Sequence, residues 1–400
     1  MKVWSEHNLD DLGEFKNGVN FSADKMGSGI ALVNVKDITD SPLLHPERLN
    51  LVDVDLSGKN GQAYFAKEGD IFFVRSSVKR EGVGAVGMLK NNSIPVIHCG
   101  FVIRYRIVDK QTDQRFLFYL LNSPIYREKV RGLSGGATIV NVSQESLKKL
   151  KLSKPILPTQ KRIASILSAY DDLIENNLKR IKLLEEIAQR TYEEWFMKFR
   201  INGEQLPIDE ATGLPIGWTG SPLGDLISFQ KGKKASIIVD EYQNGYEKLL
   251  LLDGIESGKY LYTNPIGQVI AERNDLIMLM DGARSSKVFF ADRGVVGSTL
   301  SKIVIKNSYL SSSLLKHFFE INFGWMQTNN TGAAIPHANK KFINSMPFSV
   351  PTLDVFINWK TSIEPIYNKI QNLKDQILLL KQSRDILLPR LMSGTINVEN

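Results

Sequence analysis

The stretch LPTQKRIASILSAYDDLIENNLKRIKLLEEIAQRTYEEWF occupies residues 157–196 and contains no glycine and a single proline, close to its start. Apolar residues recur in it at alternating spacings of three and four, and a stretch near the C-terminus has the same pattern. This is the heptad spacing of helices that pair as coiled coils. The predicted seams are Leu167, Tyr170, Ile174, Asn177, Ile181 and Leu184 in the first stretch, and Ile363, Ile366, Ile370, Leu373, Ile377 and Leu380 in the second.

The two stretches belong to a tandem repeat. GGATIVNVSQESLKKLKLSKPIL at 135–157 resembles TGAAIPHANKKFINSMPFSVPTL at 331–353, with Gly136 matching Gly332, 196 residues later. The same separation relates Ile174 to Ile370, and because 196 is a multiple of seven the heptad phase is kept. Two amphipathic helices lying on separate domains are the alternative, but long helices with narrow seams gain stability by pairing.

Each long helix follows a strand-rich region. In the first half, residues 68–78, 82–89 and 94–108 are predicted strands, and a helix is expected over 112–131. In the second half, the strands are predicted at 273–283, 286–297 and 298–307, and a helix is expected from about residue 313. Asp70 and Asp275 are expected to open equivalent strands. The predicted fold class is therefore α+β, with two similar globular domains and two long helices.

Connectivity predicts how the helices pair. Each globular domain precedes its own helix, and a short linker ties the second domain to the end of the first helix. The two helices must then run antiparallel, which gives a pseudo-two-fold repeat with an intramolecular coiled coil. The predicted ranges are a first domain at 1–155, a central helix at 156–200, a second domain with its preceding linker at 201–352, a C-terminal helix at 353–394 and a tail at 395–400.

The composition bounds the partners and the location. The net charge is +7 and the isoelectric point is near 9.1, which favours a polyanionic partner such as DNA. Cys99 is the only cysteine, so a disulfide framework and a multi-cysteine metal site are excluded, and a reducing cytoplasm is expected. No apolar run is long enough for a membrane span, and residues 1–15 lack a signal-peptide core.

Catalytic and metal motifs are not found. NSPIY at 122–126 is similar to the Asn-Pro-Pro-Tyr motif of amino-methyltransferases, but Ser123 and Ile125 break the pattern. The five histidines show no ligand spacing, so no metal site is predicted. The sequence therefore argues against an enzyme.

The candidate DNA-binding residues are basic and small polar residues in predicted loops, because such side chains contact phosphates and base edges. In the first half they are Arg75, Ser76, Ser77, Lys79, Arg80, Arg131, Ser134 and Thr138. In the second half they are Lys231, Lys233, Lys234, Arg284, Ser285, Ser286, Lys287, Asn330, Thr331, His337, Lys340 and Lys341.

The sequence around the first helix also resembles a known family. PILPTQKRIASILSAYDDLIENNLKRIKLLE looks like the central helix of specificity subunits of type I restriction-modification systems, with Gln160, Ile163 and Ala164 after Pro155 or Pro158. LPIGWTGSPLGDLISFQKGK at 214–233 resembles the opening of a target recognition domain in that family. The first half departs by lacking the Pro-Gly-Trp opening. The second helix departs by having TLDVFINWK where the Gln-x-x-Ile-Ala element is expected.

The resemblance implies a role in DNA recognition. Each globular domain would be a target recognition domain that reads one half of a bipartite, asymmetric site on double-stranded DNA, and the coiled coil would set the gap. The chain would be non-catalytic and hold no cofactor. It would recruit two methyltransferase subunits, which bind S-adenosylmethionine and methylate adenine, and two restriction subunits, which use ATP and Mg²⁺ to translocate DNA. The alternatives are a free-standing DNA-binding regulator with two domains and an enzyme in its own right.

Overall fold

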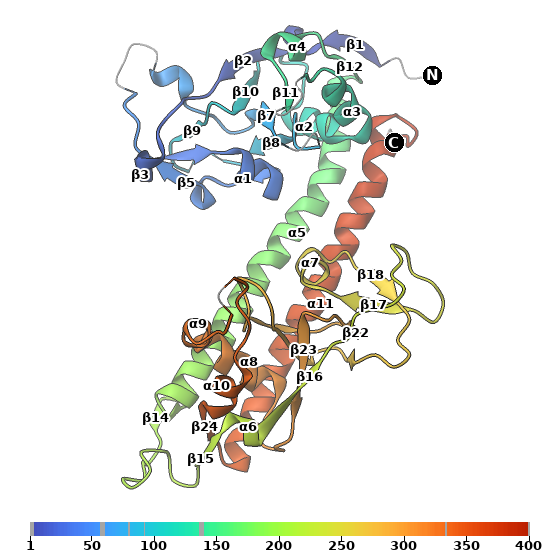
Figure 1. Cartoon of the computed structure of the whole chain (residues 1–400). Coiled ribbons are helices and arrows are strands. Elements are labelled where there is room, and N and C mark those ends of the chain that lie inside the picture. Colours follow the sequence, from blue (N-terminus) through green and yellow to red (C-terminus); the bar gives the residue numbers. More distant parts are fainter. Residues whose placement is uncertain are drawn as a thin grey trace. The chain divides into compact units, whose positions relative to one another are not determined.

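The computed structural model describes residues 4–56, 61–78, 81–91, 93–135, 140–332 and 334–398 (Figure 1). The chain forms two compact units. Unit 1 comprises Met1–Glu175 and Leu379–Asn400, and unit 2 comprises Asn176–Leu378. Each unit therefore holds one globular part together with one segment of each long helix.

Unit 1 contains a five-stranded sheet in the order β2-β10-β6-β8-β4 and a three-stranded sheet in the order β5-β3-β9. The central strand β6 is buried along its whole length, since its IFFV sequence is apolar on both faces. The strands of unit 1 are β1 (Ser5–Asn8), β2 (Gly13–Asn17), β3 (Met26–Val33), β4 (Leu43–Leu44), β5 (Asn50–Val52), β6 (Ile71–Val74), β7 (Ser76–Ser77), β8 (Val86–Leu89), β9 (Val96–His98), β10 (Val102–Ile107), β11 (Val140–Asn141) and β12 (Lys151–Lys154). Its short helices are α1 (Val35–Asp40), α2 (Gln114–Asn122), α3 (Pro124–Gly132) and α4 (Gln144–Lys148).

Unit 2 contains two four-stranded sheets, in the orders β16-β23-β20-β21 and β18-β17-β22-β19. Its strands are β13 (Arg200–Ile201), β14 (Glu204–Gln205), β15 (Thr219–Pro222), β16 (Ile227–Lys231), β17 (Glu247–Leu250), β18 (Leu261–Thr263), β19 (Ile270–Ala271), β20 (Leu276–Leu279), β21 (Val288–Phe290), β22 (Gly294–Val296), β23 (Leu300–Ile305) and β24 (Pro347–Val350). Its short helices are α6 (Leu223–Leu226), α7 (Leu252–Ser257), α8 (Ser312–Ile321), α9 (Phe323–Thr328) and α10 (Lys340–Ser345).

Several of the predicted elements are divided in the structure. The prediction of a single helix over 112–131 is wrong. The structure has two helices there, because Ser123 has extended backbone angles and Pro124 begins a new helix. Proline lacks the N–H that a continuing helix needs but suits a first turn. The predicted strands at 94–108 and 286–297 each become two strands in different sheets, β9 and β10 in one case and β21 and β22 in the other.

The repeat extends to the topology of the sheets. Strand β10 lies between β2 and β6 in unit 1, and β23 lies between β16 and β20 in unit 2. The parallel pair of β3 and β9 corresponds to the parallel pair of β17 and β22. Asp70 and Asp275 both precede the central strand, and the carboxylate of each accepts a backbone hydrogen bond of 2.7 Å from the residue three positions earlier. The predicted α+β tandem repeat is confirmed.

The opening of the first domain, which looked divergent in sequence, keeps its tryptophan. Strand β1 pairs with β12 as β15 pairs with β24, and Trp4 and Trp218 each lie just before the first strand of such a pair. Trp4 and Trp218 are 214 residues apart, whereas the loops before the long helices repeat at 196. Differences in loop length along the chain therefore hid this match from a comparison at one fixed separation.

The long helices are α5 (Leu157–Tyr192), which ends in a π-helical turn at Glu193–Met197, and α11 (Leu353–Met392). In unit 2, Asn177 contacts Gln376 and Tyr192 contacts Trp359, so the two segments run in opposite directions. In unit 1, Asp171 contacts Arg384. No helix in the described part of the chain is long and apolar enough to cross a membrane.

The predicted seam residues lie on the buried side of this helix pair. Leu167, Ile174, Asn177, Ile181, Ile363, Ile370, Leu373 and Ile377 are buried, and Tyr170, Leu184, Ile366 and Leu380 are half-buried. Leu167 shares a buried cluster with Leu391 from the other helix. Arg384, on the same seam, is anchored by the carboxylate of Asp171.

Candidate nucleic-acid interface

In unit 2 the structure gathers several predicted residues at one edge of the central sheet. Lys231 ends β16, and Asp281 follows β20 at the same edge, because both strands run antiparallel to β23 between them. The loop with His337 joins this edge through bridges to Asp281 and Thr331. Residues separated by more than a hundred positions in sequence therefore share one small surface.

Asp281 is the centre of this surface. Its Oδ1 accepts a hydrogen bond of 2.7 Å from His337 Nδ1, and its Oδ2 lies 3.9 Å from the Lys231 ammonium. A carboxylate cannot donate, so Nδ1 of His337 carries the proton and Nε2 is the ring's remaining polar atom. Half of the His337 side chain is exposed, so that atom is available to an external ligand.

Three of the predicted residues hold loops together. Ser285 and Ser286 are buried, and both hydroxyls hydrogen-bond to the amide of Asn330. Ser286 also has a positive φ of 75°, a conformation that needs such support in a non-glycine residue. These residues position the loop, and their side chains point into it.

The basic residues of unit 2 differ in how exposed their charge is. Arg284 makes a two-pronged ion pair with Glu256 at 2.6 and 3.2 Å, and Lys287 lies 3.9 Å from the same carboxylate. Lys233 donates to the backbone carbonyl of Gly267. The remaining candidates are Lys234, Thr331 and Lys341, which are exposed, and Lys340, which is half-buried with its ammonium 5.6 Å from the Phe229 ring.

Unit 1 places a similar surface at the matching edge of its sheet. Asn17 ends β2, Ser76 follows β6, and the Ser76 hydroxyl donates to the side-chain oxygen of Asn141. Gln144 Nε2 donates to Asn17 Oδ1 at 2.7 Å. Arg75 is exposed and Ser77 is half-buried beside this edge.

The other first-half candidates have separate positions. Arg131 pairs with Glu128 at 3.2 Å, and the Ser134 hydroxyl donates to the carbonyl of Arg131 at the end of α3. Lys79, Arg80 and Thr138 lie outside the described residues.

Four polar residues of these edges were missed by sequence reasoning, namely Asn17, Asn141, Gln144 and Asp281. The repeat could have identified two of them, since Asn141 and Gln144 lie 196 residues before the predicted His337 and Lys340. The candidates predicted from the sequence were mainly basic residues and hydroxyls, so these three amides and this acid were not among them.

A polar triad fixes each globular part to the helix pair. In unit 1, the Tyr119 hydroxyl donates to Asp171 at 2.5 Å, and Arg384 pairs with the same carboxylate at 2.5 Å. In unit 2, His317 lies at the position of Tyr119, since both are the sixth residue of matching helices. Its ring bonds to Gln189 at 2.9 Å and to the Tyr367 hydroxyl at 2.7 Å.

The two triads have different charge. Burial, with a smaller contribution from the charge of Lys316, lowers the pKa of His317 to about 3. The amide oxygen of Gln189 can only accept, so Nδ1 donates to it and the neutral ring accepts from Tyr367 at Nε2. Unit 2 is therefore anchored by neutral groups, and unit 1 by an ion pair.

Gln160, from the family-like motif, explains why that motif is polar. Its amide donates to the carbonyls of Gln111 and Pro155, and its oxygen accepts from the backbone N–H of Asp113. This locks the start of α5 to the start of α2. In unit 2 the indole of Trp359 donates to Ser313 at 3.2 Å, near the matching start of α8. A different residue thus fixes the second helix, which accounts for its departure from the motif.

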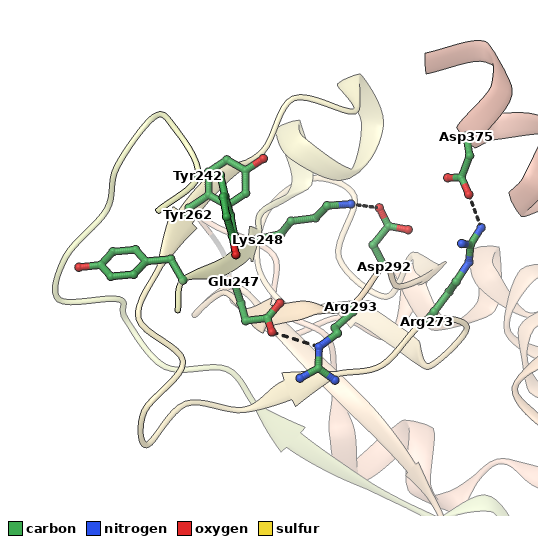
Figure 2. Close-up of a pocket in the computed structure, with 9 residues that line it drawn as sticks. Tyr242, Glu247, Lys248, Tyr262, Arg273, Asp292, Arg293 and Asp375 are labelled. Carbon is green, nitrogen blue, oxygen red and sulfur yellow. Dashed lines mark hydrogen bonds and ion pairs between the residues drawn. The ribbon is translucent and has the colours of Figure 1, made fainter. Parts of the chain in front are cut away.

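A pocket of about 410 Å³ lies elsewhere in unit 2, beside β17 and β18 (Figure 2). Its charged walls are neutralised in pairs, Lys248 with Asp292, Arg293 with Glu247 and Arg273 with Asp375. The pocket is also lined by Tyr242, Tyr246 and Tyr262. None of the predicted DNA-binding residues that the structure describes lines it. Within the described residues there is also no group of three or more His, Cys, Asp or Glu side chains that could hold a metal ion.

The fold defines a protein with two similar α+β units, each of which includes a segment of both long helices. Comparison with known proteins shows its family. The chain belongs to the type I restriction modification DNA specificity domain family, whose model matches residues 1–186 and again 215–385. It is a DNA specificity subunit of the type I restriction-modification class.

Individual relatives agree with this assignment. The chain is 24% identical to the specificity subunit of the type I restriction enzyme MjaIX from Methanocaldococcus jannaschii, over all of this chain and 94% of the relative. It is 28% identical to the HindI specificity subunit from Haemophilus influenzae, over 50% of this chain and 42% of that one. The crystal structure of the S subunit from M. genitalium has the same fold, with a TM-score of 0.61, 16% identity, and coverage of 98% of this chain and 96% of that one.

Proposed function

We propose that each unit reads one half of a bipartite, asymmetric DNA site and that the helix pair sets the gap between the halves. The observation that carries this is the matched sheet edge. Both units present polar side chains at the same topological place, but the residues differ, with amides in unit 1 and Lys231, Asp281 and His337 in unit 2. Equivalent surfaces with different chemistry suit two half-sites of different sequence.

The chain itself is non-catalytic in this proposal, and the chemistry belongs to partner subunits. Two methyltransferase subunits would bind S-adenosylmethionine, and two restriction subunits would bind ATP and Mg²⁺. The support is the family to which the chain belongs. A cytoplasmic location follows, since the host DNA is there.

The helices provide a surface for the methyltransferase subunits. In unit 1, Ile166 and Leu173 are 38% and 52% exposed and lie one heptad apart on α5. Leu379 and Ile386 are 61% and 57% exposed and lie one heptad apart on α11. Residues seven apart share a helix face, and exposed apolar stripes mark protein interfaces. The apolar positions outside the seam thus support docking of a partner.

The gap function is tested by lengthening both helices by one heptad, after Glu175 and after Leu378. These positions are the boundaries of the two units, and Asn177 and Gln376, two residues inside unit 2, are hydrogen-bonded. Seven residues keep the seam phase and add roughly 10 Å at 1.5 Å per residue. That length corresponds to about three base pairs at 3.4 Å each.

The assembly of this variant with its methyltransferase subunits is then selected against DNA with randomised gaps. We expect weaker binding, because about three base pairs also rotate the duplex by roughly 100°. The remaining preference should shift to a longer gap. A variant that folds, binds and keeps the parental gap would show that the helices do not set it. Tight, specific binding by the chain without methyltransferase subunits would favour the free-standing regulator.

A further inference from the structure

The two sheet edges can be matched residue by residue through strand register. Asn17 pairs with Ile103 across β2 and β10, and Lys231 pairs with Ser301 across β16 and β23. Ile103 and Ser301 are themselves equivalent. The residue after each of them, Arg104 or Lys302, pairs with the second residue of the neighbouring strand, β6 in unit 1 and β20 in unit 2. Asn17 and Lys231 therefore occupy the same position in the two units.

A second pair of positions lies beside the first. Gln144 is the first residue of α4, and Lys340 is the first residue of α10. Both follow a capping residue whose side chain accepts a backbone hydrogen bond, Ser143 in one unit and Asn339 in the other. The edge thus carries two amides in unit 1 and two ammonium groups in unit 2.

The amides of unit 1 leave a donor and an acceptor for a ligand. Gln144 Nε2 donates to Asn17 Oδ1, which fixes the orientation of both groups. Asn17 Nδ2 and Gln144 Oε1 make no hydrogen bond with any residue that the structure describes. A donor next to an acceptor complements the N7 and N6 amino group of adenine in the major groove.

The ammonium groups of unit 2 offer donors only. Lys231 is 56% exposed, with Asp281 at 3.9 Å, and Lys340 is held near the Phe229 ring. Guanine presents two acceptors, N7 and O6, to the major groove, and lysine is a common partner for them. The two donors fit guanine, because the nearest carboxylate, Asp281, already accepts from His337 Nδ1 and lies 3.9 Å from the Lys231 ammonium.

We propose that Asn17 with Gln144, and Lys231 with Lys340, are matched base-reading pairs. The first pair reads an adenine in the half-site of unit 1, and the second reads a guanine in the half-site of unit 2. This inference rests on the proposed function, because it assigns single bases within the two half-sites.

The first test exchanges the pairs. The wild type, the double variant K231N/K340Q and the reciprocal N17K/Q144K are each produced with the methyltransferase subunits in a host without other adenine methylation. Sequencing of methylated DNA gives the motif. K231N/K340Q should change one guanine to adenine in one half-site, and N17K/Q144K should change one adenine to guanine in the other. K259Q, a control at an exposed lysine of unit 2 that is not among the DNA-binding candidates, should leave the motif unchanged.

The outcomes separate the two proposals. A wild type that methylates no bipartite motif contradicts the proposed function. A wild type with a bipartite motif, and exchanged variants that methylate the same motif, overturns the base-reading pairs alone.

A second measurement covers variants that fail to methylate. The wild-type complex is bound to DNA in which each adenine of the unit 1 half-site is replaced in turn by 7-deazaadenine, which lacks the N7 acceptor. One replacement should weaken binding roughly ten-fold, as expected for one direct base contact. The same replacement should have no further effect on the N17A complex. If the replacement weakens DNA binding by the N17A complex as much as it weakens binding by the wild-type complex, the assignment is overturned.

Discussion

Each globular part is attached to the helix pair by a set of packed side chains, the joint. The side chains of the two joints differ more between the units than the sheets do. In unit 2 the joint is aromatic, with Tyr192, Phe196 and His317 packed around the fully buried Trp359. In unit 1 the matching helix side chains are aliphatic, Ile163, Leu391 and Met392, although their cluster also contains Phe116 and Tyr119. Ile163 and Trp359 are equivalent, 196 residues apart. The repeat therefore conserves the geometry of the joint while its chemistry changes.

The difference extends to the polar triads and indicates what each joint needs. The joint of unit 1, whose helix side chains are aliphatic, also contains the directional ion pair of Asp171 and Arg384. An aromatic joint has large rings with their own preferred geometry, and a neutral histidine completes it. Directional contacts are thus supplied by charge in one unit and by rings in the other.

The largest effect is expected when the ion pair of unit 1 is broken. Arg384→Met leaves the carboxylate of Asp171, only 7% exposed, without its cation. Losing one partner of a buried ion pair costs about 3–5 kcal/mol. Urea unfolding should show a destabilisation of that order. The double variant D171N/R384M should recover part of it, because no charge is left buried. A loss below about 1 kcal/mol in the single variant would show that solvent screens the pair.

A smaller loss is expected when the neutral triad of unit 2 is broken. His317→Leu leaves the Tyr367 hydroxyl and the Gln189 amide without their shared partner. Each unsatisfied buried group costs about 1–3 kcal/mol, partly offset by the apolar side chain that replaces the ring. We expect a net loss of about 2 kcal/mol in urea unfolding. A loss equal to that of Arg384→Met would contradict the distinction between charged and neutral joints.

The pH dependence should separate the joints further. The pKa of His317 is about 3 in the folded chain and about 6.5 when unfolded, so the unfolded state binds the proton more tightly. The contribution of His317 to stability is therefore complete above pH 6.5 and is lost as pH falls towards 3. The slope is about 1.4 kcal/mol per pH unit.

The measurement is the unfolding free energy of wild type and His317→Leu between pH 7 and 5. The wild type should lose about 2 kcal/mol more than the variant. The nearby charges are Lys316, and Glu320 at 3.9 Å from the ring. Parallel curves would mean that Glu320 stabilises the protonated ring enough to cancel the effect of burial.

The sequence predicted the repeat, the seams and most strands, because these depend on local periodicity. It did not predict the joints, because Tyr119, Asp171 and Arg384 are brought together only by the antiparallel pairing. Arg384 was visible as a charge on an apolar seam, but its partner could not be chosen among many carboxylates. The contact between Asn17 and Gln144 could not be predicted for the same reason, since the two amides are 127 positions apart.

The smallest effect is expected at the polar residue of the seam. Asn177 is buried and donates to Gln376 at 3.3 Å, a long hydrogen bond, whereas its equivalent in the second helix is the fully buried Leu373. A buried asparagine lowers the stability of a helix pair and can fix its register. Asn177→Leu should therefore stabilise the chain by about 1 kcal/mol in urea unfolding. Leu178→Asn, at the neighbouring 48% exposed position, is the matched control and should change stability by less than about 0.5 kcal/mol. A destabilised Asn177→Leu would show that the contact with Gln376 contributes more than apolar packing would. In that case the two seams are complementary and cannot be exchanged, and the difference between the units would reach into the helix pair itself.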